Sequence, residues 1–261
     1  SQINCEAWDK VALAVASTWK GCIVSPYLMV QCSDSRHYGR ISDKVYRFSA
    51  MDLSAEERKT IHGHNERIRL ETIAKATKEI NDRPVFAGVI GSYSLAGRLL
   101  DVTEALVYCY TDPDLLHVVL EKATDFLVEY IRAFKNAGLD GVVIAEPLAG
   151  LLSLELAEEF SEPYIRRIVE EVQSDDFIVI YHNCGDTALQ IMPSILNTGA
   201  AASHFGNAVK MIDVLKAVPS NCIVMGNIDP AGLFRNATPD AMKKAVTELL
   251  ERCARSSVDL L

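Results

Sequence analysis

Short apolar runs alternate with longer amphipathic segments from about residue 70 onward. The runs are rich in β-branched residues, which favour strands. We predict five strands, at Val85–Ile90, Gly141–Ala145, Phe177–Tyr181, Ala201–Phe205 and Cys222–Met225. Between these runs, apolar residues recur at spacings of three and four, which is the period of an α-helix. The predicted helices are Thr103–Cys109, Pro113–Asn136, Leu154–Gln173, Ala188–Asn197 and Pro239–Cys253.

Strands that alternate with helices indicate βα units arranged around a parallel sheet. Two helix ends carry local signals of the same organisation. Thr238 followed by Pro239 provides an N-cap and a proline at the first helical position, and Gly138 ends the helix before the strand at residue 141. The sequence therefore predicts an α/β fold, and βα units of this kind can close into a barrel.

The first 68 residues do not continue this alternation. Glu6–Thr18 is predicted to be a helix and Cys22–Val30 a strand, and a polar loop follows. We find no low-complexity linker and no internal repeat. We therefore divide the chain into a short α/β segment, residues 1–68, and a βα region, residues 69–261.

Composition places the chain among globular proteins, with 261 residues of which 49% are hydrophobic and 23% charged. The net charge of -9 and the scattered Lys and Arg residues argue against a nucleic-acid or anionic membrane partner, because neutralising phosphate needs a basic face. No apolar run approaches the length of a membrane span, and the N-terminus does not resemble a signal peptide. We expect a cytoplasmic protein with a small-molecule or protein partner.

Seven cysteines are distributed without CxxC spacing, in a chain large enough to fold without disulfides. We therefore expect reduced thiols. Cys184 stands out because it follows His182 by two residues, directly after a predicted strand. An extended backbone sends residues i and i+2 to the same side, and imidazole with thiolate is a ligand pair that suits zinc. The alternative is a buried cysteine beside a histidine that is bonded to backbone.

Other polar residues follow the predicted strands at the same end. Because the carboxyl ends of parallel strands in a βα barrel face one mouth, where active sites are built, these residues are candidates for a site. They are Ser94, Glu146, Asn207, Asn227 and Asp229. The alternatives are that Glu146 caps the helical turn that begins near Leu148 and that Asp229 is a turn residue before Pro230. We interpret His204 and His117 as ordinary histidines.

Several motifs in residues 68–253 resemble the uroporphyrinogen decarboxylase superfamily, and within it the branch of methylcobamide:coenzyme M methyltransferases. The resemblance is carried by six segments: Arg83-Pro-Val-Phe-Ala-Gly-Val-Ile-Gly91, Ser94-Leu-Ala-Gly-Arg98, Ala145-Glu-Pro-Leu-Ala-Gly150, Glu159-Phe-Ser-Glu-Pro-Tyr164, Tyr181-His-Asn-Cys-Gly185 and Met225-Gly-Asn-Ile-Asp-Pro230. It implies a partial (β/α)8 barrel of the TIM type, truncated at both ends. A partial barrel leaves open sheet edges, which we expect the N-terminal segment or a second copy of the chain to cover.

The resemblance implies a zinc-dependent transfer of a methyl group from a corrinoid protein to a small thiol. His182 and Cys184 would be zinc ligands, with a later cysteine as the third. The Gly-Cys segment that would supply this cysteine does not occur between Cys253 and Leu261. In this hypothesis Glu146 would be a catalytic base or a further zinc ligand, and Asp229 a second catalytic residue. Ser94, Asn207 and Asn227 would contact the substrate or the corrinoid partner.

Two other functions remain open. One is metal-free decarboxylation of a porphyrinogen, which the parent branch carries out, although its arginine-rich N-terminal segment has no counterpart in this sequence. The other is an inactive truncated or fused barrel that only binds a corrinoid or a partner protein.

The N-terminal segment resembles the C-terminal end of M20 family zinc peptidases. The matching segments are Pro26-Tyr-Leu-Met29, Ser33-Asp-Ser-Arg-His-Tyr38, Tyr46-Arg-Phe-Ser49 and Ile61-His-Gly-His-Asn-Glu-Arg67. The resemblance implies that His37 corresponds to a metal ligand, but the other ligands of that family are absent. We therefore expect no peptidase activity, and the alternative is that His37 is an exposed loop histidine.

Overall fold

The computed structural model describes residues 3–26, 43–46, 54, 56, 70–80 and 82–258. The chain divides into two compact units, residues 1–66 and 67–261. In the first unit the predicted helix is confirmed as α1, Glu6–Thr18. The Cys5 thiol lies 3.2 Å from the Tyr46 hydroxyl, and the rings of Trp8 and Tyr46 make an edge contact with centroids 5.5 Å apart.

The predicted strand at Cys22–Val30 is wrong for residues 22–26, which form no strand, and the rest of it lies outside the described residues. The segments that resemble M20 peptidases also lie largely outside them, and His37 is among the residues not described.

The second unit contains a parallel sheet whose five strands are ordered as they occur in the chain. The strands are β1 (Phe86–Ile90), β2 (Gly141–Ala145), β3 (Ile178–Asn183), β4 (Ala202–Phe205) and β5 (Ile223–Met225). All five predicted strands are confirmed to within two residues at each end. Consecutive order with parallel pairing means that each connection crosses back over the same side of the sheet, which is the arrangement of βα units.

Helices provide these connections and the outer layer of the unit. They are α4 (Leu70–Glu79), α5 (Ser92–Leu100), α6 (Val102–Thr111), α7 (Pro113–Asn136), α8 (Leu154–Phe160), α9 (Glu162–Val172), α10 (Met192–Asn197), α11 (Met211–Ala217) and α12 (Pro239–Val258). Two single-turn elements are η1 (Pro147–Leu151), a 3-10 helix, and η2 (Pro230–Phe234), a π-helix. No helix among the described residues is both long and apolar enough to span a bilayer.

Two of the predicted helices differ from the structure. The segment Leu154–Gln173 forms two helices that meet at Ser161, because Pro163 lies in the first turn of α9 and cannot donate an N–H to a continuous helix. Ala188–Asn197 becomes helical only from Met192, and Pro193 follows at the start of α10. Helices α4, α5 and α11 were not predicted, and α12 continues five residues beyond its predicted end at Cys253. The signals at Thr238 and Gly138 are confirmed, since Thr238 Oγ1 accepts from Ala241 N at 3.3 Å and Gly138 has a positive φ of 88°.

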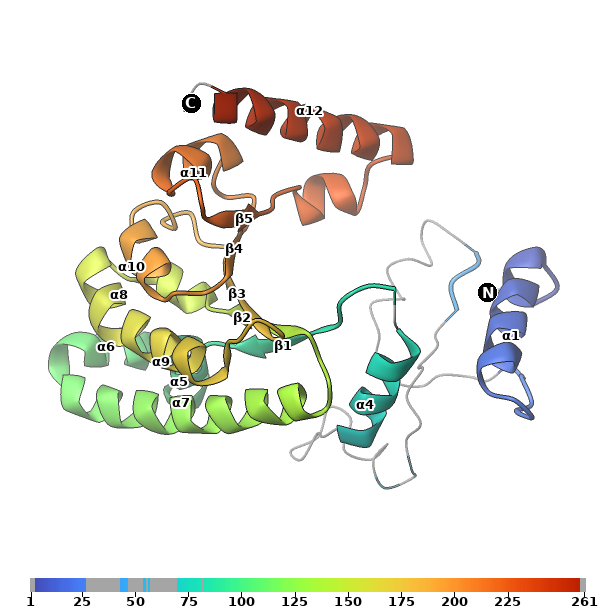
Figure 1. Ribbon diagram of the computed structural model, residues 1–261, viewed down its shortest axis with the longest axis horizontal. Coiled ribbons are helices and arrows are strands. Elements are labelled where there is room, and N and C mark those ends of the chain that lie inside the picture. Colours follow the sequence, from blue (N-terminus) through green and yellow to red (C-terminus); the bar gives the residue numbers. More distant parts are fainter. Residues whose placement is uncertain are drawn as a thin grey trace. The chain divides into compact units, whose positions relative to one another are not determined.

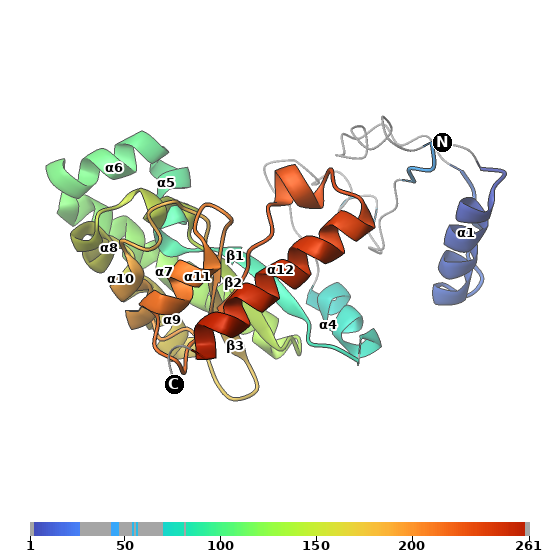
Figure 2. The same ribbon diagram turned by 90° about the horizontal axis from the view of Figure 1, so that it is seen from above.

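The two faces of the sheet differ in what covers them. Helices α5 to α11 lie on one side of the strands in both Figure 1 and Figure 2. One row of register partners faces these helices and joins the hydrophobic core at most positions: Val89, Ile144, Tyr181, Ser203 and Val224. The next row points to the opposite side because strand residues alternate, and it is partly or fully exposed: Ile90, Ala145, His182, His204 and Met225. We call these the helix-covered face and the opposite face.

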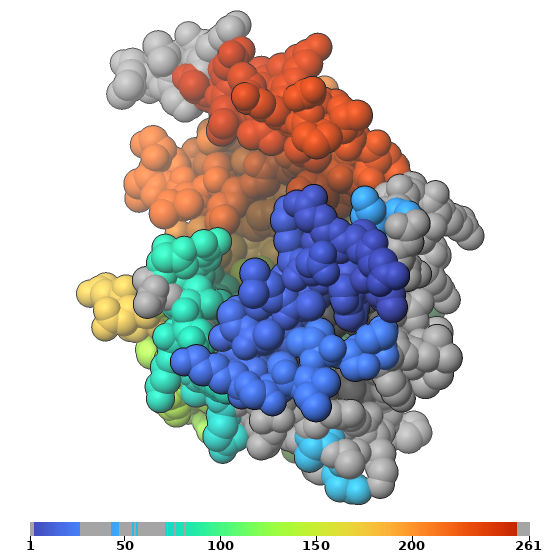
Figure 3. All heavy atoms as spheres, turned by 90° about the vertical axis from the view of Figure 1, so that its right-hand side faces the viewer, coloured from blue at the N-terminus to red at the C-terminus, as the bar shows by residue number. Residues whose placement is uncertain are grey.

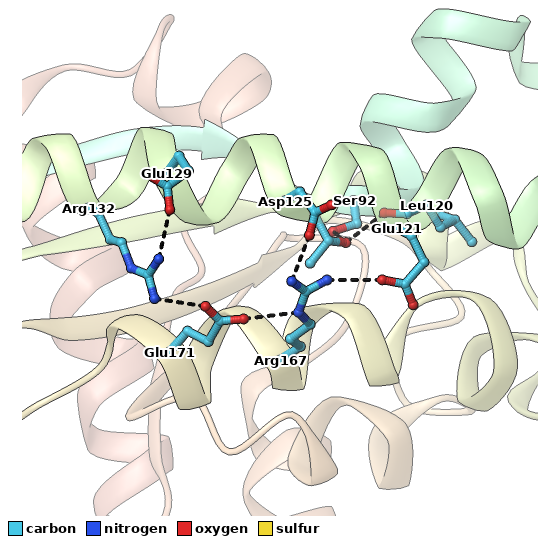
Figure 4. A network of polar contacts seen from close by, with 9 residues as sticks. Ser92, Leu120, Glu121, Asp125, Glu129, Arg132, Arg167 and Glu171 are labelled. Carbon is cyan, nitrogen blue, oxygen red and sulfur yellow. Dashed lines mark hydrogen bonds and ion pairs between the residues drawn. The ribbon is translucent and has the colours of Figure 1, made fainter.

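Helices α7 and α9 are joined at their surface by ion pairs, which Figure 4 shows. The Arg167 guanidinium contacts Glu121 at 2.9 Å, Asp125 at 2.6 Å and Glu171 at 2.9 Å. Glu171 also accepts from Arg132 at 2.8 Å. Further along the chain, α12 packs on α11, and these C-terminal elements are coloured orange to red in Figure 3.

Candidate functional site

Glu146 lies directly after β2, and its side chain is fully buried. Its carboxylate accepts hydrogen bonds from two backbone amides in the first turn of α5, Ser94 N at 2.6 Å and Tyr93 N at 3.3 Å. The residue before α5 is Gly91, which has no side chain to cap the helix, so Glu146 satisfies these amides from another strand. Burial raises the pKa of Glu146 to about 7, although the bonds from the Ser94 hydroxyl and the two amides act in the opposite direction.

This position separates Glu146 from His182. The register pairs Ala145 with His182, so these two residues share the opposite face, and Glu146, one residue later, points to the helix-covered face. Glu146 therefore does not lie beside His182 on the opposite face, and its role as a catalytic group or metal ligand stays a prediction. The alternative of a cap is closer to the structure, but the helix that it caps is α5 and not the turn that begins near Leu148.

Ser94 and Asn183 connect the loops around Glu146. Ser94 is buried, and its hydroxyl accepts from Leu148 N at 3.1 Å, at the start of η1. Asn183, also fully buried, donates to the Glu146 carbonyl at 3.2 Å and accepts from Gly185 N at 2.8 Å. In the structure the Ser94 hydroxyl holds the backbone after β2, and its contact with a substrate stays a prediction. The importance of Asn183 was not predicted, and its position between His182 and Cys184 was the only signal for it.

His182 lies near the end of β3 on the opposite face, beside His204 of β4. The two Nδ1 atoms are 2.7 Å apart, and His182 Nδ1 is also 3.2 Å from the His204 backbone carbonyl oxygen. Both histidines are half-buried. Burial lowers the pKa of His204, and the neighbouring His182 contributes in the same direction. His204 was predicted to be ordinary, and its contact with His182 corrects that interpretation.

Cys184 follows the last residue of β3 and is exposed. Gly206, after β4, lies against it: a Cβ added to Gly206 would be 2.8 Å from the Cα and Cβ atoms of Cys184. The absence of a side chain at residue 206 therefore lets the loops after β3 and β4 approach each other. The alternative of a buried cysteine beside a histidine bonded to backbone agrees with the structure only for His182, since Cys184 is exposed.

The remaining predicted residues lie in the loops after β4 and β5. Asn207 is exposed. Asn227 is half-buried and donates to the carbonyls of Gly206 at 3.0 Å and Val209 at 2.6 Å, so it joins the two loops. Asp229 Oδ1 accepts from the amides of Ala231 at 2.9 Å and Gly232 at 3.0 Å, and thereby caps η2. The alternative that Asp229 is a turn residue before Pro230 agrees with these contacts.

His182 and Cys184 have the chemistry of a zinc site, since imidazole and thiolate are its usual ligands. In the part of the chain that the structure describes, no three His, Cys, Asp or Glu side chains lie close enough to hold a metal ion together. The residues present thus fit zinc by type, and His182 and Cys184 would supply two of its ligands.

A parallel sheet in chain order, with helices on one side and polar side chains at the carboxyl ends of its strands, is consistent with part of a βα barrel. The family model of uroporphyrinogen decarboxylase (URO-D) matches residues 39–258. The chain therefore belongs to the uroporphyrinogen decarboxylase family. The match begins inside the segment that resembles M20 peptidases, and no comparison supports that second resemblance.

Individual relatives come from both branches of the family. The methylcobamide:CoM methyltransferase MtbA of Methanosarcina mazei is 29% identical over 192 residues, which cover 70% of this chain and 55% of that protein. A uroporphyrinogen decarboxylase of Desulfotalea psychrophila is 33% identical over 143 residues, which cover 54% of this chain and 40% of that protein. A solved methyltransferase from Methanosarcina mazei superposes with a TM-score of 0.65 at 22% identity and covers 70% of this chain and 54% of its own. The chain thus spans about half the length of these relatives.

Proposed function

We propose that this chain takes part in zinc-dependent methyl transfer from a corrinoid protein to a small thiol, with His182 and Cys184 as its metal ligands. The observation that carries the proposal is an exposed thiol that directly follows the strand end bearing a half-buried imidazole. The similarity to MtbA of Methanosarcina mazei supports the same branch. In such a site, zinc lowers the pKa of a bound thiol, so that the nucleophilic thiolate is present near neutral pH.

The residues around this pair have different roles in the proposal. Asn207 is exposed after β4 and is the candidate to contact the thiol substrate or the corrinoid partner. Asn227 joins the loops after β4 and β5, and Asp229 fixes the start of η2, so both shape the mouth without reacting. Glu146 and Ser94 hold α5 and η1 against the strand ends.

The proposal is tested by the zinc content of the purified protein. We expect about one zinc ion per chain in the native protein, little in Cys184→Ser, and the native amount in the control Cys222→Ser. Cys222 is a suitable control because it is a half-buried free thiol directly before β5. Equal zinc in the native protein and Cys184→Ser would remove the metal site. Transfer from methylcobalamin to coenzyme M, followed by the cobalamin absorption spectrum, then tests the reaction itself.

Decarboxylation of a porphyrinogen is the second candidate, favoured by the uroporphyrinogen decarboxylase at 33% identity. It predicts activity that survives a strong chelator and depends on Asp229 instead of Cys184. Asp229 Oδ1 is already engaged by two amides, which leaves less of this carboxylate available for a substrate. The third candidate, binding without catalysis, predicts a stoichiometric complex with a corrinoid protein and no turnover.

A further inference from the structure

The contact between His182 and His204 indicates which ring nitrogen of each histidine carries the proton. The two residues are register partners on β3 and β4, and their ring centroids are 4.8 Å apart. This separation equals the spacing of neighbouring strands, so the rings extend side by side from the same row of the sheet. Their position is set by strand pairing and not by a flexible loop.

The two acceptors near His182 Nδ1 determine where its proton lies. The His204 carbonyl oxygen, 3.2 Å away, can only accept a hydrogen bond. A lone pair on His182 Nδ1 would face the lone pairs of that oxygen, so this contact favours a hydrogen on Nδ1. The same N–H then points to His204 Nδ1 at 2.7 Å, which must be the unprotonated nitrogen of its ring. This is a three-centre hydrogen bond from one donor to two acceptors on one residue.

We infer that His204 is a positioning residue, which fixes the Nδ1–H tautomer of His182 and leaves His182 Nε2 as the nitrogen with a free lone pair. A neutral imidazole binds metal through its unprotonated nitrogen, and ligating histidines commonly donate their other N–H to a carbonyl or carboxylate. If His204 donated to His182 instead, the proton of His182 would lie on Nε2 and its lone pair on Nδ1 would be taken up by His204. The inference rests on the proposed function only in taking His182 as a ligand.

The tautomer can be measured in metal-free protein, without any activity. The chain has six histidines, so long-range proton–nitrogen correlation spectra of protein labelled with 15N-histidine are simple enough to assign, with His182→Gln identifying the signals of His182. Above about pH 8, where free imidazole is neutral, we expect the Nδ1–H pattern for His182 and the Nε2–H pattern for His204. An Nε2–H pattern for His182 in the native protein would overturn the inference.

Two substitutions of His204 separate positioning from packing. His204→Ala removes the nearer acceptor, at 2.7 Å, and keeps the backbone carbonyl at 3.2 Å. We therefore expect the preference of His182 for Nδ1–H to weaken to a mixture of tautomers, and zinc binding to be about tenfold weaker, the lower end of the effect of losing such a partner. His204→Asn places a side-chain oxygen near the position of Nδ1, and we expect it to restore both the tautomer and the affinity. His117→Ala, on α7, is the control and should leave both unchanged.

The outcomes distinguish this inference from the proposed function. Native protein that shows the Nδ1–H tautomer but binds no zinc would contradict the proposed function and leave the positioning role of His204 intact. Native zinc affinity in His204→Ala, together with an unchanged tautomer, would contradict the positioning role and leave the metal site intact.

Discussion

The two faces of the parallel sheet follow the same strands but differ in composition and in role. On the helix-covered face, Ile144 and Glu146 are completely buried. On the opposite face, Ile223 and Met225 are 62% and 40% exposed, and His182 is half-buried. The first face contributes apolar packing and a buried helix cap, whereas the second presents groups that can reach ligands. Ala145 pairs with the candidate metal ligand His182 on the opposite face, and Glu146, one residue further along the chain, points to the helix-covered face.

The largest expected effect compares one isoleucine from each face. Ile144→Ala removes fully buried side-chain atoms from the core, so we expect the free energy of unfolding to fall by about 2–5 kcal/mol. Ile223→Ala removes a largely exposed side chain, so we expect a change within about 0.5 kcal/mol. Urea unfolding followed by circular dichroism measures both. Similar losses for the two variants would mean that the opposite face is also packed.

The second effect depends on pH and tests the buried carboxyl of the helix-covered face. The pKa of Glu146 is raised to about 7 in the folded protein, so the folded state holds this proton more tightly than the unfolded state does. The free energy of unfolding therefore gains a term that is present below about pH 4.5 and is lost as the pH rises to about 7. The loss amounts to about 3 kcal/mol at 1.36 kcal/mol per pKa unit.

Glu146→Gln should remove this dependence. We expect its unfolding free energy to vary less between pH 4.5 and 7 than that of the native protein, and the exposed control Glu158→Gln to retain the native slope. Urea denaturation at a series of pH values gives both curves. Parallel curves for the native protein and Glu146→Gln would show that the carboxyl is not shifted as burial requires.

The smallest effect concerns the ion pairs on the outer surface of the helix layer. Arg167→Met keeps the aliphatic stem but removes the contacts with Glu121, Asp125 and Glu171. These groups are partly exposed, so we expect a loss of about 1 kcal/mol at low ionic strength that shrinks when salt is added. Arg98→Met, at an exposed position of α5, should change stability less. A loss that does not respond to salt would point to packing instead of charge.

Much of the sheet could be predicted from sequence, because buried parallel strands are short β-branched runs between amphipathic helices. The longest helix, α7, was predicted with both of its ends, since Pro113 at its start and Gly138 after its end are local signals. Helix α5 was missed for the opposite reason. The sequence Gly91-Ser92-Tyr93-Ser94 reads as a polar loop, and the carboxylate that caps it is Glu146, far along the chain.

The candidate site could be predicted only in part. Strand ends identified the segment that contains His182 and Cys184, and their chemistry suggested zinc. The contact between His182 and His204 depends on the register between β3 and β4, which a single sequence does not encode locally. The face to which Glu146 points could not be predicted either. Side chains alternate between the two faces, so an error of one residue in the end of a strand reverses the predicted face.

The close approach of Gly91 to Glu146 has a consequence for how this sequence can evolve. A methyl group on residue 91 would overlap Oε2 of the Glu146 carboxylate. Substitution at either position thus constrains the other, and relatives are expected to change both or neither, despite the 54 residues that intervene in the chain. A set of homologues with a larger residue at 91 and glutamate retained at 146 would contradict this correlated substitution.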